Sequence, residues 1–470
     1  MGADPYEPDP ADVATVAEAL RGVPRAAYSV PHVYPSAAPA YAQAPMAPRP
    51  PLTADRLRLY VHLPYCRYRC SFCYFAVRVG ADVEAMARYV AAVRRELEWI
   101  PPGTPLSQLF VGGGTPTVPP PDLMDDVLGA VFDRTVPFAP GQVHTVETSP
   151  ETISEAHLEV FRRRGMGRVS MGVQSLEESV LDTVHRDQTA AGALAACELL
   201  LASGLIVNID LIYGLPGQTR QSVLHDLTTL AGLGIPSLTL YNLRLSERTA
   251  VHRALGDDRM DLARLMGWRG FVKDAAESLG YTQTRWHTFK RLDTIARRHE
   301  RLPCFDENLS GYQLGVGMSA RSHLGHTVYR NHDVHEAYVG RIERGESPVE
   351  QTFTLAEDDR MTQFVARTLG DGHPLVRDEY EATFGRPVDV DFGPVLARLG
   401  EGGLVADDGR ALTLTERGRL VYDLVTLAFY PARARAWLAE RGERSAFVTI
   451  GAPAAPAPAP APAAAAPAVA

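Results

Sequence analysis

The chain has 470 residues, of which 46% are hydrophobic, and a formal net charge of −9 at pH 7. This length suggests about three units of ordinary domain size with a large buried core. No lysine-rich block is present, so nucleic acid is not an expected partner, and no apolar run is long enough to span a bilayer. The acidic first residues lack the apolar core of a secretory signal, so we expect a soluble, cytoplasmic protein.

Composition divides the chain into four predicted regions. Residues 1–54 are an N-terminal arm rich in Pro and Ala, and residues 441–470 are an Ala/Pro-rich tail. The tail cannot build a core and is expected to be disordered. Between them, residues 55–350 are predicted to form the main domain with its extension, and residues 351–440 a smaller C-terminal domain.

Strand-like and helix-like segments alternate through the middle of the chain. The strand candidates are 57–63, 108–111, 143–148, 168–173, 206–213 and 238–243. The helix candidates are 82–99, 122–132, 154–164, 176–184, 190–202 and 221–233, after a short one near 12–20 in the arm. Repeated strand–helix units predict parallel strands with right-handed crossovers. The pattern therefore predicts an α/β fold, a partial (β/α)6 TIM-like barrel with its site at the carboxyl ends of the strands.

The smaller C-terminal domain has a different pattern. A helix is expected over 357–369, and Asp408-Gly409 marks a turn, which between apolar strands signals a hairpin. Together with the segments 392–399 and 412–429, this order resembles a small winged-helix-like α+β unit. Its acidic character favours a structural lid over a DNA-binding module.

Three cysteines, Cys66, Cys70 and Cys73, follow the first predicted strand with the spacing C-x3-C-x2-C. Three thiolates can hold three corners of a cubane iron–sulfur cluster, which normally takes four cysteines, so one iron is left open. An open iron can chelate the amino and carboxylate groups of S-adenosylmethionine (SAM), and one electron then releases a 5′-deoxyadenosyl radical. The spacing therefore predicts a [4Fe-4S] cluster and SAM as cofactors.

Zinc or a disulfide would explain these cysteines less well. A structural zinc site needs a second pair of Cys or His, and the next cysteine is Cys197. A chain of this length with 5 Cys is not a disulfide framework. Cys197 lies in an apolar helical run and is expected to pack in the core, whereas Cys304 is either buried or near the substrate.

Polar groups near the ends of later strands are further site candidates. The run 112–117 is Gly-Gly-Gly-Thr-Pro-Thr, and its glycines would let a ligand approach the backbone, although a plain tight turn would explain them too. Glu147 ends the third strand, where it would face the barrel mouth or be a solvated turn residue, and Gln174 follows the fourth. Arg186 suits capture of a carboxylate or is an exposed cation at a helix end. Asp210 lies in an apolar strand and needs a partner, such as a ribose diol or a buried cation.

Taken together, these motifs resemble the radical SAM superfamily, and more narrowly the group around oxygen-independent coproporphyrinogen III dehydrogenase. The resemblance rests on residues 60–66, 66–73, 112–117, 168–175, 184–188, 208–216 and 414–420. It implies that the first SAM site is lined by Tyr60, Gly113, Gly114, Glu147, Gln174, Arg186 and Asp210, with Phe72 against the cluster and the adenine. It also implies a small-molecule substrate and a low-potential electron donor such as flavodoxin or ferredoxin.

The group contains three kinds of protein. Porphyrinogen dehydrogenases decarboxylate propionate side chains, class C methyltransferases use a second SAM to methylate or cyclopropanate an sp2 carbon, and a third branch consists of haem chaperones. The dehydrogenases have a fourth cysteine where this chain has Phe75, and the His-Asn pair of the chaperones is Glu307-Asn308 here. We therefore expect a methyltransferase or cyclopropanase that binds two SAM molecules and acts on a small natural product. The alternatives are a coproporphyrinogen III dehydrogenase and a haem-binding protein.

One cation stands out in the segment 314–322, which resembles the part bordering the second SAM or the substrate. Arg321 would suit an anionic group on either molecule, although an external salt bridge would explain it too. Arg321 and Glu147 are the residues that we expect to act in catalysis.

Overall fold

The computed structural model describes residues 4–23, 56–244, 249–251, 261–291 and 312–441. Most of the Pro/Ala-rich arm, the Ala/Pro tail, Cys304 and the Glu307-Asn308 pair lie outside these described residues. Within the described ranges, no helix is long and apolar enough to cross a membrane.

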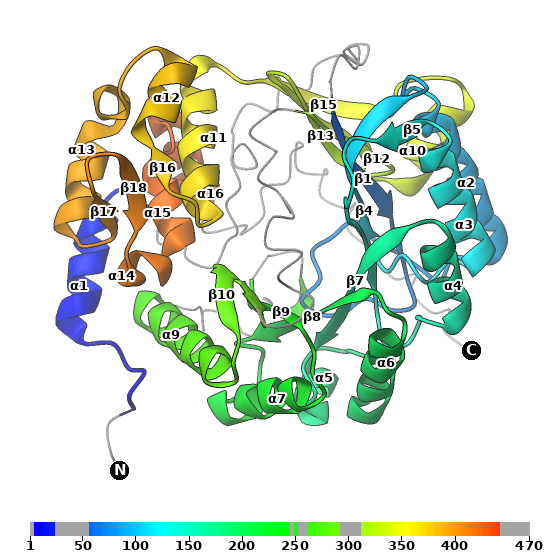
Figure 1. Ribbon diagram of the computed structural model, residues 1–470, viewed down its shortest axis with the longest axis horizontal. Helices are drawn as coiled ribbons and strands as arrows, with labels where there is room; N and C mark the ends of the chain where they lie inside the picture. Colours follow the sequence, from blue (N-terminus) through cyan, green and yellow to red (C-terminus); the bar gives the residue numbers. More distant parts are fainter. Residues whose placement is uncertain (1–3, 24–55, 245–248, 252–260, 292–311, 442–470) are drawn as a thin grey trace, which may run out of the picture.

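A 13-stranded sheet forms the larger part of the described molecule (Figure 1). Its centre consists of parallel strands in the order β9-β8-β7-β6-β4-β1. Their bounds are β1 (Leu57–Leu63), β4 (Thr104–Gly113), β6 (His144–Thr148), β7 (Met166–Gln174), β8 (Ile206–Tyr213) and β9 (Ser237–Asn242). Helices connect these strands in chain order, which confirms the predicted partial (β/α)6 barrel.

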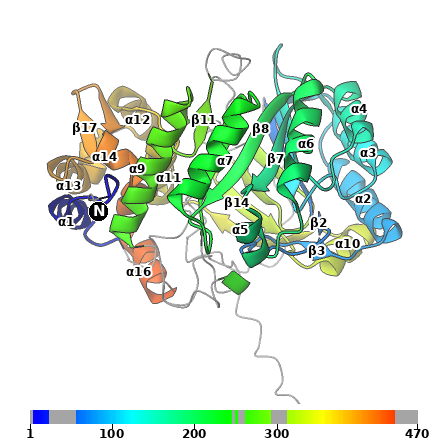
Figure 2. The ribbon, with the colours of Figure 1, turned by 90° about the horizontal axis from the view of Figure 1, so that it is seen from below.

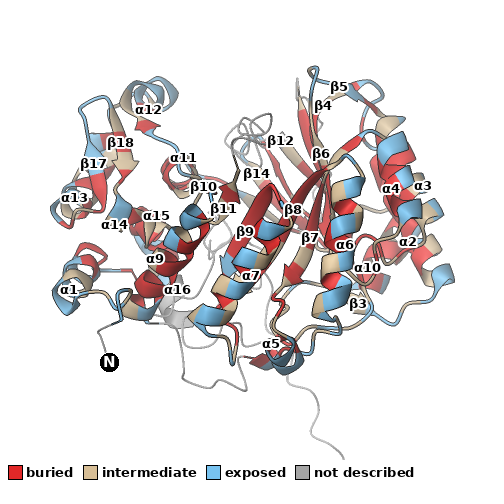
Figure 3. Ribbon diagram, turned by 60° about the horizontal axis from the view of Figure 1, so that its bottom comes forward, coloured by how far each residue is buried: buried red, intermediate tan, exposed pale blue. Residues whose placement is uncertain are grey.

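The helices between the strands cover the outer face of the sheet. They are α2 (Val83–Leu97), α3 (Pro121–Phe132), α4 (Glu155–Arg163), α5 (Glu178–Thr183), α6 (Ala190–Ala202), α7 (Arg220–Gly232) and α9 (Leu262–Ser278). Figure 2 shows α6 and α7 against β7 and β8, and Figure 3 shows that their exposed residues face away from the sheet. The helices cover one face of the strands, so apolar and polar residues alternate along them, as in β1, where Leu57, Leu59, Val61 and Leu63 alternate with Arg58, Tyr60 and His62.

Side-chain caps explain where several of these helices begin. The side chains of Asp82, Ser154, Thr189 and Thr219 each accept a hydrogen bond from a backbone N–H in the first turn of the helix that follows. A cap of this kind stabilises a helix by about 1 kcal/mol. The starts of α2, α4, α6 and α7 therefore lie within one residue of the predicted starts.

The sheet extends beyond the parallel strands at both edges. Next to β1, β12 (Tyr312–Val316) is parallel, and β13 (Arg321–Leu324), β14 (Thr327–Asn331) and β15 (Val349–Thr354) continue in antiparallel order. At the other edge, β10 (Thr282–Arg285) and β11 (Thr288–Lys290) form an antiparallel pair beside β9. β5 (Thr135–Pro137) pairs with β4, and α10 (His335–Glu343) packs on α2. These additions were not among the predicted elements.

The C-terminal residues form a separate layer of helices around a small sheet. The helices are α11 (Glu357–Gly370), α12 (Arg377–Phe384), α13 (Val388–Glu401), α14 (Glu416–Arg419), α15 (Tyr422–Ala428) and α16 (Ala432–Arg441). The strands are β16 (Leu375–Val376), β17 (Val405–Asp407) and β18 (Ala411–Leu414), and the predicted hairpin joins β17 to β18. We call residues 357–441 the C-terminal module. Its equivalence to a winged-helix domain stays a prediction.

Residues 4–23 form a strap that joins the C-terminal module to the barrel. The strap contains α1 (Pro10–Ala19), which contacts both α9 and α13. Arg417 of the module donates to Asp12 at 2.6 Å, and Arg398 donates to the Ala19 carbonyl at 2.9 Å. On the barrel side, the Tyr6 ring meets Phe271 edge-on at 5.3 Å. The predicted helix in the arm is therefore confirmed.

Candidate active site

A two-stranded pair closes the loop that carries the three cysteines. β2 (Tyr65–Cys66) lies parallel to β3 (Arg78–Val79), so both ends of the loop are held together at the end of β1. The three thiols are free and half-buried, and they line a cavity of about 540 Å³. Within the described residues they are not gathered as tightly as the ligands of one metal ion. A multi-iron cluster does not require this, because each thiolate binds a different iron.

Burial disfavours the ionised form of two of the three thiols. Burial raises the pKa of Cys66 to about 12 and also raises that of Cys73. Bound metal reverses this balance, because a coordinating thiol is deprotonated. The Thr115 hydroxyl lies 3.8 Å from the Cys66 sulfur, where it can stabilise a thiolate.

Arg186 lies beside the cysteine loop rather than in solvent. Its Nη1 donates to the Cys70 sulfur at 3.7 Å, and its Nη2 donates to the Gly172 carbonyl. Glu151 is 3.9 Å from the same guanidinium, whose side chain is only 9% exposed. The exposed-cation explanation of Arg186 is therefore wrong, and the residue is placed where it could meet an anionic part of SAM.

The glycine run serves the packing of the cysteine loop. A Cβ on Gly114 would lie 2.6 Å from the Tyr65 carbonyl oxygen, and one on Gly112 would lie 2.5 Å from a Glu147 carboxylate oxygen. Gly113 also has φ of +121°, which other residues rarely adopt. The glycines are thus required by the protein's own contacts, although Gly113 and Gly114 also line the cavity.

Glu147 and Asp210 form a pair of half-buried acids near the carboxyl ends of β6 and β8. Glu147 accepts a hydrogen bond from the Gly113 N–H at 3.2 Å, and burial, assisted by the nearby Asp210, raises its pKa to about 7. Burial also raises the pKa of Asp210, which accepts from Ser170 at 3.0 Å and from Asn208 at 2.8 Å. Both carboxyl groups line the cavity and can accept hydrogen bonds from a ligand.

The remaining predicted residues divide into two groups. Gln174 and Phe72 line the cavity, and Gln174 has the unusual φ of +73° at a bulge between β7 and β8. Tyr60 and Arg321 are not among the described residues that line it. The Tyr60 hydroxyl is hydrogen-bonded to Nδ1 of His62 at 3.0 Å, and its ring stacks on Phe110. The roles predicted for Tyr60 in SAM binding and for Arg321 in catalysis stay predictions.

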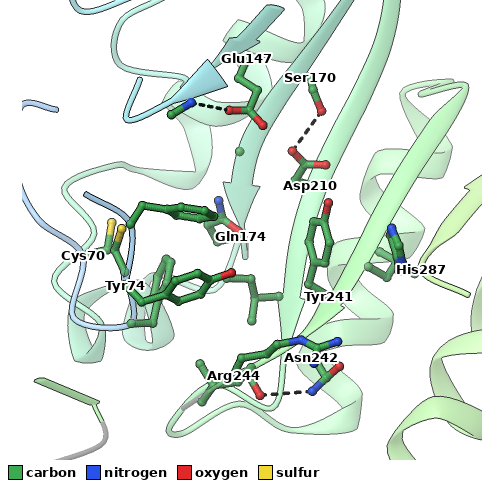
Figure 4. Close-up of a pocket in the computed structure, with 18 of the residues that line it drawn as sticks. Cys70, Tyr74, Glu147, Ser170, Gln174, Asp210, Tyr241, Asn242, Arg244 and His287 are labelled. Atoms are coloured by element: carbon green, nitrogen blue, oxygen red, sulfur yellow. Dashed lines mark hydrogen bonds between the residues drawn. The ribbon is translucent and has the colours of Figure 1, made fainter. Parts of the chain in front are cut away.

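The cavity continues beyond the predicted site towards the C-terminal module. Figure 4 shows Glu147 and Asp210 at one end and Arg244 and Asn242 at the other, with Tyr241 between them. The lining residues that sequence reasoning missed include Tyr74, Tyr241, Arg244, Arg285, Trp286, His287, Arg367 and Tyr422. Tyr241 and Arg244 lie near the carboxyl end of β9. The expectation that site residues follow the carboxyl ends of barrel strands could therefore have found them. Arg367 and Tyr422 belong to the module, whose position the sequence does not reveal.

Comparison with known proteins identifies the domain. Residues 60–230 match the family model "Radical SAM superfamily". These residues form a radical SAM domain. Its cofactors are a [4Fe-4S] cluster and SAM, as predicted. The donor set fits both groups, since three thiols, Arg186 and two carboxyl groups line one cavity.

Similarity to individual proteins extends over most of the chain. The oxygen-independent coproporphyrinogen III oxidase of Paracoccus denitrificans is 26% identical over 79% of this chain and 86% of its own length. The heme chaperone HemW of Bacillus subtilis is 24% identical over 79% of this chain and 98% of its own length. Among solved structures, the coproporphyrinogen III oxidase of Escherichia coli has a TM-score of 0.69 and 25% identity, covering 80% of this chain and 91% of that one.

These comparisons overturn the predicted methyltransferase or cyclopropanase. Several of the similar proteins are named coproporphyrinogen III oxidases and another is named a heme chaperone, which favours the two alternatives, the oxidase first. A second SAM has no support from these proteins. The prediction gave too much weight to position 75. Phe75 is 50% exposed and packs on Tyr74 at the cavity wall. The residue at this position can therefore differ while Cys66, Cys70 and Cys73 stay in place.

Proposed function

We propose that the protein is an oxygen-independent coproporphyrinogen III oxidase, which oxidatively decarboxylates propionate side chains of a porphyrinogen. The observation that carries this proposal is the continuous cavity. It joins the cysteine loop to a wall of aromatic and cationic residues, in a chain whose relatives of this name match over most of their length. At about 540 Å³, the cavity is within the usual range for a site that binds an organic ligand.

The overall reaction balances without a further oxidant. SAM and a propionate side chain give methionine, 5′-deoxyadenosine, CO2 and a vinyl group, so SAM takes up the two electrons that the side chain loses. When bound, the cluster and SAM supply a 5′-deoxyadenosyl radical that abstracts hydrogen from the side chain. We extend the proposal to a low-potential donor such as flavodoxin or ferredoxin, which would supply the initiating electron. The side-chain radical would give one electron back to the cluster or the donor when CO2 leaves, so that the net reaction stays balanced.

The chain's own residues would orient the reactants and exclude water. Arg186 would hold an anionic group of SAM next to Cys70, which it already contacts. Asp210, fixed by Ser170 and Asn208, would accept hydrogen bonds from the ribose hydroxyl groups. Phe72 and Tyr241 would shield the space between SAM and substrate, which protects a reactive intermediate from solvent.

The test is an anaerobic reaction of the reconstituted protein with SAM, dithionite and coproporphyrinogen III. We expect 5′-deoxyadenosine, CO2 and products lighter by 46 mass units for each propionate converted, about the sum of CO2 and two hydrogens. Propionate deuterated at the reacting methylene should transfer deuterium to 5′-deoxyadenosine. Deoxyadenosine without substrate-dependent CO2 would contradict the proposed function. A Soret band on haem addition without SAM cleavage would favour a haem-binding protein instead.

A further inference from the structure

We propose that Gln188 is a positioning residue of the SAM site: its side-chain amide orients the Arg186 guanidinium and holds Gln174 in an unusual backbone conformation. This inference rests on the proposed function, in which Arg186 meets an anionic group of SAM, and deepens it. Gln188 is not itself among the described residues that line the cavity. It would therefore act through its two neighbours rather than by touching SAM.

The side-chain amide of Gln188 bonds to three groups at once. Its Oε1 accepts a hydrogen bond from Nε of Arg186 at 2.9 Å. Its Nε2 donates to two backbone carbonyls, that of Val173 at 2.6 Å and that of Ser175 at 3.2 Å. A guanidinium only donates and a carbonyl only accepts, so one orientation of the amide alone satisfies all three groups. One side chain thus connects the cation of the site to the end of β7.

The two carbonyls that Gln188 binds belong to the residues on either side of Gln174. Gln174 has φ of +73°, which residues other than glycine rarely adopt. Such a conformation persists only where the surrounding structure holds it. The Gln174 side chain lines the cavity, where Figure 4 shows it. By bonding both flanking carbonyls, Gln188 fixes the turn that places Gln174 in the site.

The bond from Gln188 to Nε also determines where the rest of the Arg186 guanidinium lies, because this group is planar. Nη1 donates to the Cys70 sulfur at 3.7 Å, and Nη2 donates to the Gly172 carbonyl. All three nitrogens therefore have a partner, so a rotation of the group breaks several hydrogen bonds at once. The side chain is only 9% exposed, and water would replace these bonds poorly.

The chain around Gln188 is also attached to the cysteine loop. The Val184 carbonyl accepts a hydrogen bond from the Ser71 N–H at 2.9 Å. The next residue, His185, has φ of +52°, so the chain turns sharply there. Segment 184–188 therefore lies between the cysteine loop and the end of β7. Gln188 completes this connection, because its amide bonds the β7 side.

A second group holds the turn after β7 from another element. Asp226 on α7 accepts hydrogen bonds from the Ser175 hydroxyl at 2.8 Å and from the Leu176 N–H at 3.0 Å. Asp226 is 1% exposed, so these bonds are well shielded from water. They secure the turn to the barrel, whereas Gln188 connects the turn to the cation. Because this anchor remains, we expect the protein to fold when Gln188 is replaced.

The test measures SAM affinity of the full-length, cluster-loaded protein under anaerobic conditions. Gln188→Met keeps the approximate length of the side chain but removes its three hydrogen bonds. We expect the Kd for SAM to rise by about tenfold, while iron content stays at the wild-type level. At saturating SAM, the electron paramagnetic resonance spectrum of the reduced cluster should differ from that of the wild type. The two spectra without SAM should be alike, which a general loss of stability would not produce.

Double-mutant cycles decide whether Gln188 acts through its neighbours. In the backgrounds Arg186→Gln and Gln174→Ala, Gln188→Met should change SAM affinity by about threefold or less, because one of its two routes is already lost. Full additivity in both cycles would overturn the positioning role. Coupling in either cycle supports it, and its size shows which neighbour carries more of the effect.

Gln218 provides a matched control, because it bonds the turn after β8 in a similar way. Its Nε2 donates to the Ile212 carbonyl at 3.1 Å, and its Oε1 accepts from the Leu215 N–H at 3.2 Å. Like Gln188 it is half-buried, but these partners are backbone groups rather than a cavity cation. Gln218→Met should lower the unfolding temperature about as much as Gln188→Met and leave SAM affinity unchanged. An equal loss of SAM affinity in both variants would overturn the proposal.

The outcomes distinguish this inference from the proposed function, because coproporphyrinogen III is absent from the binding measurement. If Gln188→Met weakens SAM binding as expected but the wild-type protein releases no CO2 from coproporphyrinogen III, the positioning role stands and the proposed reaction is wrong. If the wild type decarboxylates coproporphyrinogen III but Gln188→Met binds SAM as tightly as the wild type, the positioning role alone is wrong.

Discussion

The chemistry of single residues in the cavity is governed by burial. The cysteines, Glu147, Asp210 and Arg186 would each be unremarkable in water, but here they line one cavity and are partly shielded from solvent. Burial raises the pKa of Cys66, Cys73, Glu147 and Asp210 and so favours their neutral forms, and metal binding would have to deprotonate the thiols. Ligand binding and ionisation are therefore linked at this site.

The first prediction at this scale concerns the cluster ligands. Cys66→Ala, Cys70→Ala and Cys73→Ala should each reduce bound iron and 5′-deoxyadenosine formation to background, because a three-thiol site has no spare ligand. Iron analysis and anaerobic product analysis measure both. Cys197→Ala is the control, since Cys197 is buried in α6 and should affect only stability. Full iron content in any of the three loop variants would contradict the assignment.

The second prediction concerns Glu147 and pH. Its carboxyl pKa rises from 4.5 to about 7 on folding, so the native state binds the proton more tightly. This contribution to the free energy of unfolding is full below about pH 4.5 and is lost as pH rises through about 7. The shift corresponds to on the order of 3 kcal/mol. Without SAM, Glu147→Gln should therefore be more stable than the wild type at pH 8, and the difference should shrink towards pH 5.5.

Urea unfolding at the two pH values tests this dependence. Glu155→Gln removes an exposed carboxylate from α4 and serves as the matched control, which should show no such pH dependence. A constant difference between Glu147→Gln and the wild type at both pH values would mean that Glu147 does not titrate in this range.

At the scale of elements, a buried ion pair joins the barrel to the C-terminal module. Arg269 on α9 and Asp423 on α15 are 7% and 2% exposed, and two hydrogen bonds connect them. Removing one partner leaves the other charge buried and should cost about 3–5 kcal/mol. Arg269→Met should therefore be strongly destabilising, whereas Arg269→Met with Asp423→Leu should recover much of the loss. Thermal unfolding measures both, and simple additivity of the two substitutions would contradict the coupling.

The sequence predicted the elements of the parallel barrel better than those around it. Strands β1 and β8 have the predicted bounds, because both are rich in apolar residues at alternate positions and end at a turn residue, Pro64 or Gly214. The predicted segment 412–429 was less accurate, since Thr415 caps α14 and divides the segment into β18, α14 and α15. The cysteine site was predicted from spacing alone, and the three thiols line one cavity. Arg285 and Arg367 could not be found this way, because their proximity depends on how α11 packs beside β10.

On the scale of the whole molecule, the cavity depends on contact between the barrel and the C-terminal module, since residues of both line it. The strap of residues 4–23 contributes to this, since Val16 and Leu20 are buried in the same core as α13 and α15. Leu20 is only 1% exposed. Leu20→Ala should cost about 2–5 kcal/mol of stability, whereas Glu18→Ala on the exposed side should cost little. Urea unfolding of both variants checks this, and equal stability would mean that the strap is dispensable.

The position of the strap has a consequence for synthesis on the ribosome. Helix α1 is made long before its partners, because α9 starts at residue 262 and α13 at residue 388. Until those segments emerge, Val16 and Leu20 have no partner surface, and α1 is too short to be stable alone. The barrel strands β1 to β9 can pair meanwhile, so the cysteine loop is in place before the strap closes over the finished chain. Assembly therefore leaves a period in which the nascent protein has its metal-binding loop but lacks the completed far wall of the cavity.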